Sequence, residues 1–178
     1  MHQESLDIMW HYVNTIDRLV KDRRCLNVLD VGSRAIGENK TYRDLFSTLD
    51  PMSVRFKYTG LDVEGGPNVN IVVGDPYDWL GMDNLFDVVI SGQAFEHIEY
   101  PWETIRQIEK VLKPGGYAVL IGPTTPTIHR FPVDCWRILP DGWNALAKWA
   151  KLEVIESTMN QYHGEWHDAY CFLQKGTL

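Results

Sequence analysis

The chain has 178 residues, of which 44% are hydrophobic and 23% charged, and it carries a formal net charge of −7 at pH 7. This length and composition are typical of one globular domain with its own core, and they exclude a disordered or fibrous chain. The acidic balance removes the attraction for phosphate backbones that dominates nucleic-acid binding. A small-molecule partner is therefore expected, and a nucleic-acid partner is not.

The sequence also bears on location and redox state. No apolar run approaches the roughly 20 residues that a membrane-spanning helix needs, and the first five residues lack the basic start of a signal peptide. We therefore expect a cytoplasmic protein with no membrane partner. The three cysteines, Cys25, Cys135 and Cys171, are far apart and show no C-x-x-C spacing, so they are interpreted as reduced thiols.

Apolar residues recur at three- and four-residue steps between Leu6 and Val20, which predicts an amphipathic helix. We expect residues 1–22 to form a lid helix that packs on the core of a single domain spanning residues 1–178. Further helical patterns are predicted at residues 41–49, 101–112 and 140–150, the last two with a proline in the first turn. Apolar and β-branched runs predict strands at 25–31, 55–63, 69–73, 85–90, 116–121, 152–157 and 169–173.

Strands that alternate with helices predict a doubly wound α/β fold, in which a mainly parallel sheet is covered on both faces. One connection departs from this pattern. Between the second and third strands lie only Glu-Gly-Gly-Pro-Asn and a few neighbours, too few for the usual crossover helix. We therefore predict that this helix is missing. Either the third strand is short and loosely paired, or this flank of the sheet is left open and is a candidate surface for a homodimer.

Ligands of open parallel sheets bind beyond the carboxyl ends of the strands, and three residues stand at such ends. Gly32 ends the first strand, where it permits close approach of a ligand to the backbone. Asp62 ends the second strand, where a carboxylate can accept both hydroxyls of a ribose. Asp75 ends the third strand. We expect the three to converge on one ligand.

Six short motifs follow one another in the order of the predicted strands: Val28-Leu29-Asp30-Val31-Gly32, Gly60-Leu61-Asp62, Gly74-Asp75, Phe86-Asp87-Val88-Val89-Ile90-Ser91, Phe95-Glu96-His97-Ile98 and Leu112-Lys113-Pro114-Gly115-Gly116. In these motifs the chain resembles the class I S-adenosylmethionine-dependent methyltransferases of the small-molecule, methyltransferase-11-like type. The resemblance covers residues 25–173. It implies a Rossmann-like sheet of seven strands with the last strand antiparallel, and S-adenosyl-L-methionine as cofactor.

The resemblance also implies which residues hold the cofactor. Gly32 and Ser33 face its methionine part, Asp62 the ribose, Asp75 the adenine, and Ser91 lies under the sulfonium. The full implied set is Asp30, Gly32, Ser33, Arg34, Asp62, Val63, Asp75, Pro76, Ser91 and Gln93.

The chain departs from the family's G-x-G-x-G pattern, because Arg34 and Ile36 stand at the second and third glycine positions. A dinucleotide needs close backbone approach at the second glycine, so a dehydrogenase is disfavoured. Arg34 is either a bidentate clamp for the methionine carboxylate or a solvent-facing loop residue.

Residues 122–143 contain four prolines together with aromatic and charged side chains, and we interpret them as an acceptor-binding loop suited to a sugar or another polar ring. A purely structural loop is the alternative. Candidate bases are His97, His129 and Asp134, and candidate acceptor-binding residues are Arg130, Trp136, Arg137, His163 and His167. The spacing of histidines and carboxylates is not diagnostic of a metal, so no metal site is expected.

The sequence therefore predicts methyl transfer from S-adenosylmethionine to a small polar acceptor, with a hydroxyl of a sugar or natural product preferred. N-methylation of an amine or of a protein side chain is a second possibility. A catalytically silent cofactor-binding subunit is a third, suggested by the altered glycine loop and the missing helix.

Overall fold

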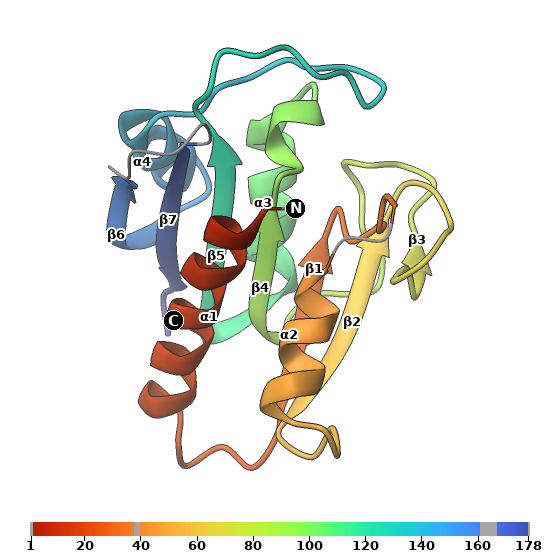
Figure 1. The fold of residues 1–178 in the computed structure, drawn as a ribbon. Helices are drawn as coiled ribbons and strands as arrows, with labels where there is room; N and C mark the ends of the chain where they lie inside the picture. The colour runs from red at the N-terminus through yellow and green to blue at the C-terminus, as the bar shows by residue number, and fades with distance from the viewer. Residues whose placement is uncertain (1, 38–39, 161–166, 178) are drawn as a thin grey trace.

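The computed structural model describes residues 2–37, 40–160 and 167–177 (Figure 1). The helices are α1 (Gln3–Leu19), α2 (Tyr42–Leu49), the short 3₁₀ turn η1 (Phe95–His97), α3 (Pro101–Val111) and α4 (Pro140–Trp149). The strands are β1 (Leu26–Val31), β2 (Phe56–Asp62), β3 (Ile71–Val72), β4 (Phe86–Gly92), β5 (Leu112–Pro123), β6 (Leu152–Met159) and β7 (Asp168–Lys175). Each predicted strand and helix has a counterpart here, with ends that shift by a few residues.

The strands form one seven-stranded sheet in the order β3-β2-β1-β4-β5-β7-β6. The pairs β1 with β2, β2 with β3, β1 with β4 and β4 with β5 are parallel. The last strand, β7, lies between β5 and β6 and is antiparallel to both. The predicted α/β architecture is confirmed, including the antiparallel last strand.

Two apolar layers sandwich the sheet, because successive side chains of a strand point to opposite faces. Helices α1 and α2 cover the near face in Figure 1, where α1 buries Met9, Val13 and Ile16. Helices α3 and α4 cover the other face, where Trp143 of α4 packs edge-on against Phe95. Within the described residues, no helix has the length and apolar character to cross a bilayer. Helix α1 is thus part of the core layer on one face.

The connection between β2 and β3 contains no helix over residues 63–70, all of which the structure describes, so the predicted loss is confirmed. Strand β3 pairs with β2 through Ile71 and Val72 only, and it forms an edge of the sheet. Residues 73–85 likewise run through turns to β4. They are anchored by Trp79, which is 2% exposed and whose amide donates to the Gln107 side chain of α3 at 3.3 Å.

Asp87, on β4, holds three strands together at the end of the sheet opposite the carboxyl ends. Its carboxylate accepts hydrogen bonds from the Asn27 amide of β1 at 2.9 Å, from Lys113 of β5 at 2.6 Å and from Arg23 at 2.8 Å. Burial by itself would raise the pKa of Asp87, but these donors outweigh it and lower the pKa below its ordinary value. The charged form of Asp87 is therefore favoured in the folded protein.

We expect Asp87→Asn to lower the free energy of unfolding at pH 7 by about 1–3 kcal/mol, a range that allows for the partly exposed cations. A lowered folded-state pKa gives stability that is complete above the unfolded pKa near 4 and is lost as the pH falls through the folded pKa. The difference between wild type and variant in urea unfolding should shrink from pH 7 to pH 3. Exposed Asp83, changed to Asn, is the control, and a difference equal at both pH values contradicts the assignment.

Candidate functional site

The carboxyl ends of the parallel strands bring the predicted cofactor residues to one rim of the sheet. The amides of Gly32 and Ser33, after β1, both donate to the Leu61 carbonyl of β2 at 2.9 and 3.1 Å. The Val73 amide, after β3, donates to the Asp62 carbonyl at 3.0 Å. The segments that carry Gly32, Asp62 and Asp75 are therefore hydrogen-bonded neighbours, as the sequence predicts.

Gly32 has a φ of +74°, in the left-handed region that favours glycine. A Cβ atom at this position would lie 2.5 Å from the Cβ of Ala94, which follows β4. The loop after β1 thus lies directly against the segment after β4, and no larger residue fits between them. The predicted methionine-facing loop therefore contacts Ala94, which lies two positions before Glu96 in the chain.

Asp62 organises the loop that lacks the usual glycines. Its Oδ2 accepts the Arg34 amide at 3.0 Å and its Oδ1 accepts the Glu64 amide at 3.2 Å. A carboxylate has about four lone-pair directions, so each oxygen retains capacity for a further donor such as a ribose hydroxyl. Asp62 therefore fixes the loop and still suits its predicted role.

The other predicted cofactor residues at this rim differ in their partners and in their exposure. The Arg34 guanidinium pairs with Glu64 through Nη1, so its role as a clamp on a carboxylate stays a prediction. Asp75 is exposed and accepts the Tyr77 amide at 2.8 Å, and Val63 and Pro76 are exposed beside it. The altered glycine loop is thus closed by an ion pair rather than by close backbone approach.

Three deeper residues are engaged with the protein itself. The Ser91 hydroxyl is buried and donates to the Val31 carbonyl at 2.8 Å, which links β4 to β1. Asp30 accepts a hydrogen bond from Tyr58, and burial raises the pKa of Asp30 to about 7. Gln93 donates to buried Asp168 at 3.0 Å. These residues therefore stabilise the ends of the strands beneath the rim.

One buried polar atom at this rim has no partner. Ser33 is 7% exposed, and its Oγ forms no hydrogen bond with any residue that the structure describes. A buried hydroxyl of this kind normally has a partner, so its vacancy is consistent with a ligand group. Together with the hydrogen-bond acceptor capacity that remains on Asp62, this unpaired Ser33 hydroxyl indicates that the rim fits a polar ligand of the adenosyl-methionine type.

Residues 122–143 fold over the same end of the sheet and are held by one side chain. Arg137 uses all five of its N–H donors within the loop. Two bind Asp134 at 2.5 and 2.9 Å, and the others bind the carbonyls of Thr125, Thr127 and Trp136 at 2.6, 2.7 and 2.7 Å. The predicted acceptor contact of Arg137 therefore has no spare donor, and the residue clasps the loop.

Asp134 is likewise committed. It accepts the His129 amide at 2.7 Å in addition to the Arg137 fork. Hydrogen bonds from Arg137, followed by that from the His129 amide, lower the pKa of Asp134 well below its ordinary range. A carboxylate so strongly stabilised is a weak base. Among the three predicted bases, Asp134 is therefore placed as a support for His129.

The remaining predicted acceptor residues frame the loop. The Trp136 indole donates to the Ile98 carbonyl at 2.9 Å. Trp136 is 39% exposed, and its ring lies beside that of Trp102. Arg130 is exposed. His167 ties the loop to β7, because its carbonyl accepts the Thr124 amide at 2.7 Å. His163 lies outside the described residues.

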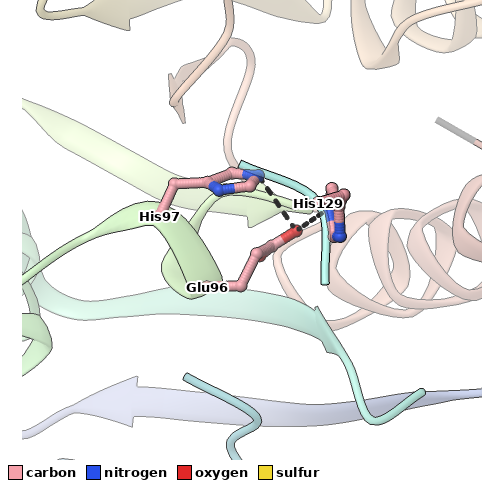
Figure 2. A group of neighbouring side chains, drawn as sticks. All are labelled: Glu96, His97 and His129. Atoms are coloured by element: carbon pink, nitrogen blue, oxygen red, sulfur yellow. Dashed lines mark ion pairs between the residues drawn. The ribbon is translucent and has the colours of Figure 1, made fainter. Parts of the chain in front are cut away.

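The two predicted histidines converge on a carboxylate that the sequence did not single out, as Figure 2 shows. Glu96 is 2% exposed, and its Oε1 lies 3.7 Å from Nε2 of His97 and 3.7 Å from Nε2 of His129. Burial raises the pKa of Glu96 to about 7 and lowers the pKa of His97. The sequence signals for Glu96 were its place directly before His97 after a buried strand and its membership of the Phe95-Glu96-His97-Ile98 motif.

Comparisons with known proteins agree with this geometry. The family described as a methyltransferase domain matches residues 46–120. Two Oryza sativa subsp. japonica proteins are similar: 2-methyl-6-phytyl-1,4-hydroquinone methyltransferase 1, chloroplastic, is 40% identical over 74 residues (40% of this chain, 22% of that protein). Its counterpart, 2-methyl-6-phytyl-1,4-hydroquinone methyltransferase 2, chloroplastic, is 30% identical over 126 residues (66% of this chain, 35% of that protein). The chain thus spans about a third or less of the length of these relatives.

A solved structure shows the same fold over nearly the whole chain. The crystal structure of the trans-methyltransferase CalH in complex with SAH matches with a TM-score of 0.69 at 16% identity, covering 96% of this chain and 59% of that chain. The family match, the order of the strands and the motifs at the strand ends all agree with one another. Over residues 46–120 the chain is similar to this methyltransferase family, and nearly the whole chain has the fold of a solved methyltransferase.

Proposed function

We propose that this protein transfers a methyl group from S-adenosylmethionine to a hydroxyl oxygen of a small polar acceptor, such as a sugar, held under residues 122–143. One observation carries the proposal. The contact between Gly32 and Ala94 sets the cofactor rim beside a buried carboxylate and two imidazoles. Methyl donor and acceptor would therefore meet at that junction.

The rim residues would bind and orient the cofactor. Asp62 would accept the ribose hydroxyls, Asp75 the adenine amino group, and the Ser33 hydroxyl would bind the methionine part. Bound S-adenosylmethionine supplies a methyl group already activated by a positive sulfur, so the protein has to align an acceptor behind it. Holding two reactants in line contributes most of the rate of such a displacement.

The acceptor side must also dispose of a proton. As the bond between oxygen and methyl forms and the bond between sulfur and methyl breaks, the hydroxyl loses its proton. His97 and His129 would act on that hydroxyl, since Arg137 lowers the pKa of Asp134 and so makes Asp134 a weak base. His97 donates from Nδ1 to the Val133 carbonyl at 2.7 Å, which leaves Nε2 as the unprotonated nitrogen of the neutral ring.

A hydroquinone is the second candidate acceptor. It is favoured by the two rice relatives, whose names describe hydroquinone methyltransferases. The partly exposed rings of Trp102 and Trp136, with centroids 6.2 Å apart, give the loop an aromatic side that suits a ring. Release of S-adenosylhomocysteine with a panel of sugars, hydroquinones and amines separates these acceptors. Binding of S-adenosylmethionine without turnover across the panel would instead favour a silent cofactor-binding subunit.

Asp62→Ala should weaken S-adenosylmethionine binding by about 1–3 kcal/mol, as expected when charged hydrogen bonds to hydroxyls are lost. Isothermal titration calorimetry with S-adenosylmethionine measures the change. Asp83→Ala, which removes an exposed carboxylate before β4, is the matched control. Unchanged affinity of the Asp62 variant, with its thermal unfolding preserved, would remove Asp62 from the cofactor site.

His129→Ala should lower kcat by about 10²–10⁴-fold, the usual contribution of a group that assists proton removal, while the affinity for S-adenosylmethionine stays the same. The side chain of His129 is 42% exposed, so its truncation should leave the fold intact. The assay follows S-adenosylhomocysteine release with the best acceptor of the panel. His11→Ala, at an exposed position of α1, serves as control. Wild-type turnover in the His129 variant would make the loop purely structural.

A further inference from the structure

Three side chains of the acceptor side form a cluster with the composition of a metal site. One ligand atom each from Glu96, His97 and His129 can be chosen so that all lie within 4.8 Å of one another. Figure 2 shows the Glu96 carboxylate between the two rings, with His97 next to it on η1 and His129 on the loop. Two imidazoles and one carboxylate are a common set of protein ligands for a divalent transition ion that keeps open positions.

The spacing indicates an ion rather than direct hydrogen bonds. Both contacts between Glu96 Oε1 and a histidine Nε2 measure 3.7 Å, beyond the range of a hydrogen bond. Ligand atoms on one tetrahedral ion lie about 3.3 Å apart, given metal distances of about 2.0–2.2 Å. Each Glu96 contact would have to close by only about 0.4 Å to fit this geometry. The two Glu96 contacts are therefore expanded by little from a ligated arrangement, and the two imidazoles, with ring centroids 5.0 Å apart, would also have to adjust.

The carboxylate at its centre has unmet binding capacity. Glu96 has a side chain that is 1% exposed, and neither of its oxygens forms a hydrogen bond with any residue that the structure describes. A carboxylate buried in this state is costly unless a cation or donors compensate it. Its oxygen points toward the two rings, where a cation would lie.

The His97 ring is held by a hydrogen bond, and the His129 ring lies beside a carboxylate. His97 Nδ1 is occupied by the Val133 carbonyl at 2.7 Å, so its Nε2 presents the lone pair. His129 has its Nδ1 3.8 Å from Asp134 Oδ2, and the same carboxylate accepts its backbone amide at 2.7 Å. Ligating histidines are typically oriented by a carbonyl or carboxylate on the nitrogen that faces away from the metal. His97 has this support on its ring, whereas for His129 the Asp134 carboxylate fixes the backbone and lies near the ring without a hydrogen bond to it.

We propose that Glu96, His97 and His129 form a binding site for a divalent transition ion of the zinc type. The site lies where the proposed acceptor would stand, so a hydroxyl could complete the coordination and be made more acidic by the ion's charge. With the ion bound, the Nε2 atoms of His97 and His129 are ligands rather than bases, and the hydroxyl proton would pass to water. Only this use of the ion rests on the proposed methyl transfer. The binding site itself does not.

The test uses untagged full-length protein that has been stripped with a chelator and dialysed. Titration with Co²⁺, followed by its visible absorption, reports ligation by nitrogen and oxygen, and calorimetry with Zn²⁺ gives stoichiometry and affinity. We expect one equivalent to bind in the wild type. Glu96→Gln and His129→Ala should each weaken binding at least about ten-fold, since changes even to residues that orient the ligands cost 10–100-fold.

His11→Ala is the matched control, because His11 is an exposed histidine on α1 outside the cluster, and it should bind as the wild type does. Circular dichroism confirms that each variant is folded. Equal binding by the wild type and both cluster variants, or no saturable binding in any of them, would overturn the proposal. Calorimetry with S-adenosylmethionine on the stripped protein is run separately, so that failure of the methyltransferase proposal and failure of the metal site are distinguishable.

Discussion

The packing of Gly32 against Ala94 is the contact on which the site depends. It joins the loop after β1, which would hold the cofactor, to the segment after β4, which carries Glu96 and His97. A side chain at residue 32 would have to occupy space 2.5 Å from the Ala94 Cβ, in a backbone conformation that disfavours any side chain. The distance between the proposed cofactor and acceptor groups would thus be set by the closeness of two loops, and the sheet beneath holds both loops in place.

Specific side-chain contacts take the place of the missing crossover helices. Parallel strands are usually joined by a crossover helix, whereas here residues 63–70 and 73–85 run through turns. Their place is taken by specific anchors: the Asp62 carboxylate holds the Arg34 and Glu64 amides, and Trp79 fills the core beside α3. A compact loop can replace a helix when its backbone amides find side-chain acceptors. The shortened flank therefore keeps the rim in order without the usual glycines.

The two carboxylates on the proposed acceptor side, Asp134 and Glu96, differ in how their charge is compensated. Asp134 and Arg137 neutralise one another and rigidify the loop, whereas Glu96 lies buried with no hydrogen-bond donor within the described part of the chain. This difference follows from the fork of Arg137, whose five donors are all used by its own loop. A carboxylate paired in this way is structural. A carboxylate that is buried without such pairing is available for a cation or an acceptor, and here it faces two imidazoles.

The sequence alone determined the strands, the helices, the lost crossover and the residues at the strand ends, because periodicity and turn residues are local signals and parallel strands share one edge. It could not assign partners to long polar side chains. His129 reaches Glu96 across 33 positions of chain, and Arg137 turns inward to its own loop rather than toward an acceptor. Both outcomes depend on the path of a proline-rich loop over the sheet. That path is decided by tertiary packing and hydrogen bonding among distant residues, for which a single sequence carries no local pattern.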